Sequence, residues 1–120
     1  MNMSKSAIGL ATQLLASDEN GLSDLRLHRF NAVEAHDDSA IESLYVDFIT
    51  DFERAQAELS ASYGEPSRTG TAEDKVIPLN GVFRFSVWDI QGRSLFMAAA
   101  HEDRGLPILL MLGTVTPDQL

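Results

Sequence analysis

The sequence predicts one α+β domain over residues 1–120, in which N-terminal helices pack on a C-terminal antiparallel meander of three or more strands. Two observations predict it. Apolar residues recur at steps of three and four over residues 39–63, and from residue 82 the apolar period changes to two. A length of 120 residues suits a single domain, and a 44% hydrophobic share is ordinary for a globular protein.

The N-terminal part is expected to hold one modest helix and then a less regular segment. Residues 4–16 place apolar side chains at helical spacing, and the polar residues 18–21 form a turn signal that ends the helix. Residues 22–33 fit a helix poorly, and Leu25 and Leu27 could instead alternate on a short strand. For this segment we favour a short helix or an irregular stretch.

A long amphipathic helix is predicted over residues 39–63. Ser39 followed by Glu42 has the pattern of a capping box at its start, and Gly64 with Pro66 is typical of a helix end. The opposite, polar face is expected to carry Asp47, Asp51, Arg54 and Glu58. The apolar stripe, which includes an aromatic group that we interpret as core, consists of Ile41, Leu44, Tyr45, Phe48, Ile49, Phe52, Ala55, Leu59 and Tyr63.

The C-terminal part reads as three strands after an exposed loop at residues 65–75. Gly92 suits a hairpin turn within residues 89–93, a second strand follows over 94–100, and a charged turn at 101–105 leads into an apolar strand over 106–115. Trp88 could be covered by the long helix or exposed as a binding anchor. In the first strand, alternation places Phe83, Phe85 and Val87 on one face and Arg84, Ser86 and Trp88 on the other.

Charge is the most informative property of the composition. Eighteen acidic residues against nine basic ones give a net charge of −9. Such a chain repels nucleic acids and anionic membranes, which recruit proteins through Lys and Arg, and it attracts basic proteins. Seven of the acids lie between Phe30 and Glu53, a stretch without Lys or Arg. The sequence shows no secretory signal and no membrane-spanning stretch, so we expect a cytoplasmic protein.

Signatures of catalysis are missing from the sequence. It has no phosphate-binding loop, no nucleophile elbow, no dinucleotide fingerprint and no cysteine, and His28, His36 and His101 are not spaced as metal ligands. We therefore expect no catalytic residue, no cofactor and no metal site. The cluster His101-Glu102-Asp103 could be half of a metal site or an acid/base pair, but we favour a structural turn or a partner contact.

A group of short motifs resembles the small acidic immunity proteins encoded beside bacterial polymorphic toxins, including those of Rhs and type VI secretion systems. The motifs are Tyr63-Gly64-Glu65-Pro66, Trp88, the turn at Gly92, and the run from His101 to Pro107 that leads into Ile108-Leu109-Leu110. The resemblance covers residues of about 40–115. It implies a protein that binds one cognate toxin domain, blocks the active site of that domain and has no catalysis of its own.

The function expected from the sequence is therefore that of an immunity protein that covers a basic toxin or effector domain with an acidic surface. The alternative is an acidic type III secretion chaperone, which would hold an effector segment on apolar strand residues such as Phe83, Phe85, Leu95 and Met97. A homodimer is possible in either case. The expected partner-binding residues, chosen from the charge distribution, are Glu34, Asp37, Asp38, Asp47, Asp51, Glu58, His101, Glu102 and Asp103.

Overall fold

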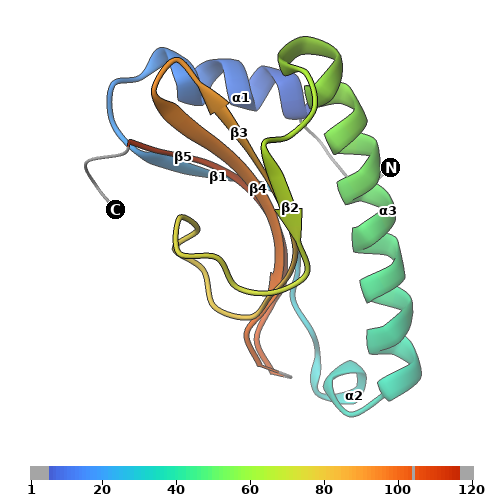
Figure 1. Cartoon of the computed structure of the whole chain (residues 1–120). Helices are drawn as coiled ribbons and strands as arrows, with labels where there is room; N and C mark the ends of the chain where they lie inside the picture. The colour runs from blue at the N-terminus through green and yellow to red at the C-terminus, as the bar shows by residue number, and fades with distance from the viewer. Residues whose placement is uncertain (1–5, 104, 117–120) are drawn as a thin grey trace.

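A computed structural model describes residues 6–103 and 105–116 and shows an antiparallel sheet with its helices on one face (Figure 1). The predicted α+β class is confirmed, with five strands in place of the minimum of three. The elements are α1 (Ala7–Ala16), β1 (Gly21–His28), α2 (Ala32–Ala35), α3 (Asp38–Tyr63), β2 (Arg68–Gly70), β3 (Val82–Ile90), β4 (Arg93–His101) and β5 (Ile108–Val115). The strands follow the spatial order β1-β5-β4-β3-β2.

The long helix α3 forms where its periodicity predicts, but its first turn is capped differently. Asp37 is the N-cap and its carboxylate accepts a hydrogen bond from the Ala40 amide at 3.2 Å, so the expected capping box of Ser39 and Glu42 is wrong. An aspartate at this position also places negative charge at the positive end of the helix dipole. Gly64 ends the helix with φ 82°, a value that favours glycine.

The helix-facing side of the sheet holds the main core. Phe48 and Phe52 of α3 have no exposed surface, and they pack among β4 and β5 side chains such as Leu95 and Leu110. Trp88, for which the sequence allowed two placements, lies in this core with 1% exposure. Its indole Nε1 donates to the Gly64 carbonyl at 2.9 Å, which ties β3 to the end of α3.

A second apolar layer covers part of the opposite side of the sheet. The segment of residues 71–81, here called the covering loop, folds back over β3 and β4 (Figure 1). Its Val76 and Ile77 are buried against Phe85 and Phe96, directly after the exposed loop that the sequence predicts over residues 65–75. That stretch also contains the short strand β2, which pairs with β3.

The covering loop is held by one carboxylate. Asp74 accepts two hydrogen bonds from Arg68 of β2, at 2.9 and 3.2 Å, and a third from the Val76 amide at 3.0 Å. The Arg68 guanidinium and the Val76 amide hold the pKa of the Asp74 carboxyl below its ordinary value, although partial burial opposes them. The loop therefore depends on Asp74 being ionised.

Two expectations about strands are wrong. Residues 22–33 do not form a short helix or an irregular stretch, because residues 21–28 are strand β1, followed by the short helix α2. Bulges explain why local periodicity fails here and in β3. The register of β1 shifts between Asp24 and Arg26, and that of β3 shifts between Val82 and Arg84. The second bulge turns Phe83 to the helix side, where it stacks on Tyr45 with ring centroids 4.7 Å apart. The expectation that Phe83 shares a face with Phe85 and Val87 is therefore wrong.

The core placement of α3 predicts large losses of stability on truncation. Phe48→Ala and Phe52→Ala should each lower the free energy of unfolding by about 3–5 kcal/mol, because each removes a fully buried ring. Urea unfolding followed by circular dichroism measures the effect. Val46→Ala, at a side chain that is 63% exposed on the same helix, is the control and should change stability by less than about 0.5 kcal/mol. Equal losses for all three variants would contradict the assigned core face.

The Asp74 pairing predicts a defined pH dependence. Since folding lowers this pKa, the stabilisation is complete above the ordinary Asp value near 3.8 and is lost as the pH falls through the lower folded value. The gap in unfolding free energy between the natural protein and Asp74→Asn should therefore be constant from pH 7 to about pH 5 and shrink below pH 4. Denaturant titrations at several pH values measure it. A gap that widens on acidification would refute the assignment.

Candidate protein-binding site

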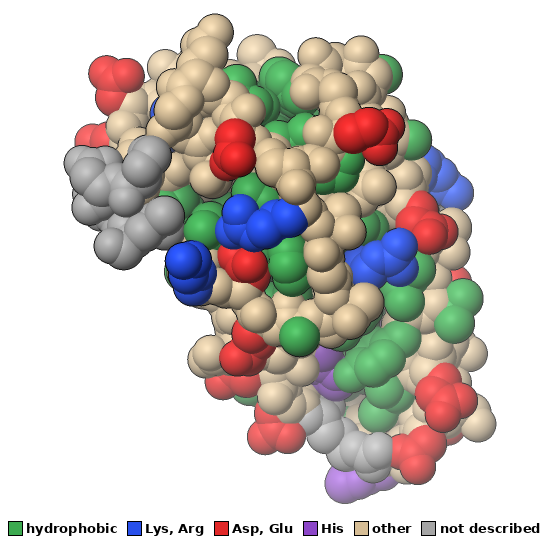
Figure 2. Space-filling model, in the orientation of Figure 1, with side chains coloured by type: hydrophobic (Ala, Val, Ile, Leu, Met, Phe, Trp, Pro, Cys, Tyr) green, Lys and Arg blue, Asp and Glu red, His purple; other side chains and the backbone are tan. Residues whose placement is uncertain are grey.

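Acidic residues from three separate parts of the chain gather at one end of the molecule, which we call the acidic end. Helix α2 and the start of α3 reach this end, and so does the turn between β4 and β5 (Figure 1). In Figure 2 acidic side chains appear at the lower end of the view together with histidine and apolar side chains, and the Lys and Arg side chains coloured in this view lie higher. The acids of the acidic end are Glu34, Asp37, Asp38, Glu42, Glu102 and Asp103.

His101 connects the acidic turn between β4 and β5 to helix α3. Its Nδ1 lies 2.7 Å from the Tyr45 hydroxyl of α3, and its Nε2 lies 3.1 Å from the Leu106 carbonyl oxygen. Because a carbonyl only accepts, Nε2 carries a proton and donates it to the Leu106 carbonyl, while Nδ1 pairs with the Tyr45 hydroxyl. The Phe30 ring packs on the other side with its centroid 5.2 Å from that of His101. The imidazole thus fixes the β4–β5 turn against α3.

A hollow opens beside this histidine. It has a volume of about 270 Å³ and is lined by Ile41, Tyr45, His101, Glu102 and Asp103. Glu102 and Asp103 are exposed, so their charges act on the solvent side of the hollow. An apolar side chain, a phenol and two carboxylates in one small depression match the stem and the cationic head of a Lys or Arg side chain.

The two acids nearest to α2 also have local structural roles. Glu34 and Asn31 form a reciprocal capping box, and the Glu34 carboxylate lies 3.5 Å from His28 Nε2. Asp37 caps α3. These contacts fix the positions of the two carboxylates, and both remain at helix N-termini near the surface, so their charge still contributes to the field of the acidic end.

Asp51 does not lie on the exposed face predicted for it. Its side chain is 4% exposed, and its carboxylate pairs with Arg26 of β1 at 2.8 Å and with Arg54 at 3.5 Å. The Arg26 guanidinium also lies 4.2 Å from the centre of the Phe48 ring. Asp51 is therefore a link between α3 and β1, and it offers a partner no accessible surface.

Glu58 is also engaged within the fold. It is half-buried, and its carboxylate accepts a hydrogen bond from the Ile8 amide at 3.0 Å, which satisfies a free amide in the first turn of α1. Asp47, one turn before Asp51, is exposed as predicted. Of the helix-face acids expected to meet a partner, the structure thus leaves Asp47 at the surface and places Asp51 and Glu58 in structural contacts.

The sequence analysis missed the apolar part of the acidic end. Val33 of α2 is 78% exposed, and Leu106 of the β4–β5 turn is 44% exposed. Exposed branched side chains among acids are typical of an interface with an apolar centre and a charged rim. Their exposure depends on the fold and has no signal in local periodicity.

The described residues contain neither a metal site nor a membrane-spanning helix, and comparison with known proteins gives no match. Within residues 6–103 and 105–116, no group of three or more His, Asp or Glu side chains is arranged to hold a metal ion. No helix in the same part of the chain is long and apolar enough to cross a membrane. Comparison of the chain with family models, curated proteins and solved structures finds no match.

The buried position of Asp51 predicts that neighbouring aspartates differ sharply. Asp51→Ala should destabilise the fold by about 3–5 kcal/mol, because it leaves the largely buried Arg26 without its closest counter-charge. Asp47→Ala, at an exposed site on the same helix, should change stability by less than about 0.5 kcal/mol. Thermal and urea unfolding of the two variants provide the measurement. A loss below about 1 kcal/mol for Asp51→Ala would show that the ion pair is dispensable.

Proposed function

We propose that this chain is a cytoplasmic immunity protein, which binds a basic toxin domain through its acidic end and keeps substrate out of the toxin's active site. The observation that carries the proposal is the contact of His101 with Tyr45, because it joins the acids of residues 34–42 and those of the β4–β5 turn into one surface. The resemblance in residues of about 40–115 points to the same function.

The electrostatics of the surface support this assignment. A net charge of −9 gives the protein a field that accelerates encounter with a basic partner and slows encounter with nucleic acid. Toxin domains that act on nucleic acids or nucleotides need basic active sites, so an acidic surface imitates the charge of their substrates. The exposed Val33 and Leu106 would supply the apolar contacts that charge alone does not provide.

The chaperone alternative has less support. It relies on exposed apolar side chains along the strands, but Phe85, Leu95 and Met97 are buried and Phe83 is partly buried under Tyr45. These residues serve the core on one or the other side of the sheet. Among the described residues, the large apolar side chains that are exposed on strands are those of Leu22 and Leu27, and both lie on β1.

Charge reversal at the turn tests the proposed function. The chain is co-expressed in a bacterial host with the product of the gene next to its own, tested as the candidate toxin, and survival and the association rate of the purified pair are measured. Glu102→Lys with Asp103→Lys should lower the association rate at least 10-fold at low salt and flatten its salt dependence. The reason is that the charge of the turn changes from negative to positive, so the turn no longer attracts a basic partner. Survival should fall in parallel.

The matched control reverses two exposed acids at the opposite end of the sheet. Glu65→Lys with Asp89→Lys makes the same change in net charge, beyond the end of α3 and next to the β3–β4 hairpin. It should lower the association rate less than about threefold. Equal effects of both double variants would show that only net charge matters and would reject the acidic end as the binding surface. No protection by the natural protein would reject the immunity function itself.

A further inference from the structure

The outer edge of β1 is the longest unpaired strand edge in the described part of the chain. β1 has eight residues and pairs with β5 on one side, and no strand of the described residues lies on its other side. The opposite edge of the sheet is formed by β2, which has only three residues. An unpaired edge presents backbone amides and carbonyls at every second residue, and these can bind an added strand.

Apolar side chains lie beside this edge on the face that the covering loop shares. Leu22 is 48% exposed and stands opposite Gly113 of β5, and Leu27 is 38% exposed and stands opposite Leu109. Cross-strand partners share a face, so both leucines lie on the loop side of the sheet. The covering loop packs over β3 and β4 and leaves these leucines uncovered.

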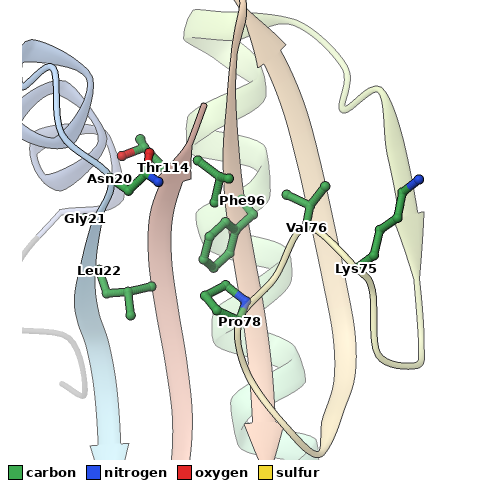
Figure 3. A pocket seen from close by; sticks show the side chains of 9 residues that line it. Asn20, Gly21, Leu22, Lys75, Val76, Pro78, Phe96 and Thr114 are labelled. Carbon is green, nitrogen blue, oxygen red and sulfur yellow. The ribbon is translucent and has the colours of Figure 1, made fainter. Parts of the chain in front are cut away.

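A hollow of about 330 Å³ separates the start of β1 from the covering loop (Figure 3). Its walls are mainly apolar and include Leu22, Val76, Pro78 and Phe96. Gly113 leaves space for the Phe96 ring that lines the hollow, because a Cβ at this position would overlap with that ring. Lys75 stands at the rim, and Figure 3 shows its side chain directed away from the other lining residues.

The charges around the edge select the kind of occupant. Asp24 is exposed, stands opposite Met111 and thus lies between the two leucines on the same face. Asp18 and Glu19 are exposed just before the strand. A second copy of this chain would bring the same acids together and add its own charge of −9, whereas a segment with a basic residue at the middle position would pair with Asp24.

We propose that β1 binds an extended segment of the partner protein as a sixth strand, with apolar, basic and apolar side chains at three alternate positions. The apolar side chains contact Leu22 and Leu27, the one beside Leu22 reaches toward the hollow, and the basic side chain faces Asp24. Strand addition of this kind takes its affinity from backbone hydrogen bonds and its selectivity from alternate side chains. The inference rests on the proposed function, since it identifies a second contact with the same basic partner.

Three blocked heptapeptides test the inference by titration of the isotope-labelled full chain, observed by NMR. The probe Thr-Val-Thr-Lys-Thr-Val-Thr has the proposed pattern, Thr-Val-Thr-Glu-Thr-Val-Thr reverses its charge, and Thr-Thr-Val-Lys-Val-Thr-Thr keeps the composition but breaks the spacing. The probe should bind at least 10-fold more tightly than either control. Its largest shifts should fall on the amides of residues 21–28, and outward amides of β1 should exchange more slowly with solvent.

Two matched variants locate the binding. Leu22→Lys removes an exposed apolar contact and should lower the affinity for the probe peptide at least 10-fold. Ala57→Lys adds the same charge on the exposed face of α3 and should change the affinity for the probe peptide less than twofold. Circular dichroism confirms that both variants fold. Equal affinities for the three peptides, shifts confined to the acidic end, or no binding at all would each overturn the inference. The charge-reversal test of the acidic end does not involve β1. A negative result in that test would reject the proposed function, whereas a negative result with the peptides would reject only the binding of a strand to β1.

Discussion

The central strand β4 has no polar face, and this constraint organises the rest of the molecule. Residues 95–100 are all buried, and they alternate between the two sides of the sheet. A sheet with two apolar sides must be covered twice. Helices α1 and α3 cover one side, and the covering loop, fixed by Asp74 and Arg68, supplies the second cover on the other side.

The two covers end at different places, and this difference produces the two surfaces to which we assign binding. On the helix side, α3 reaches past the sheet far enough for Tyr45 to hold His101, so the β4–β5 turn and the start of α3 form one acidic surface. On the loop side, the cover reaches the rim of the hollow and leaves Leu22 exposed at the edge.

Local patterns predicted the parts of the fold that depend on local interactions. The 3.6-residue period located α3 and its buried rings, and Gly92 located a hairpin turn that has positive φ at both Gln91 and Gly92. β1 was missed because its leucines serve a neighbour, β5, that is distant in sequence and because a bulge disturbs its alternation. Asp51 was misplaced for a related reason: its counter-charge, Arg26, lies on that same missed strand.

The candidate site was predictable as a set of residues but not as a surface. The acids of residues 34–38 and of residues 102–103 were identified from charge alone, yet their proximity depends on the contacts of His101 with Tyr45 and Phe30, which are distant in sequence.

The pairing of β1 with β5 also has a kinetic meaning. His28 pairs with Ile108, so this contact closes a loop of about 80 residues, whereas β3, β4 and β5 are joined by short turns. We expect the meander to form first and β1 to join last, which makes the outermost strand of the finished sheet also the latest to be assembled.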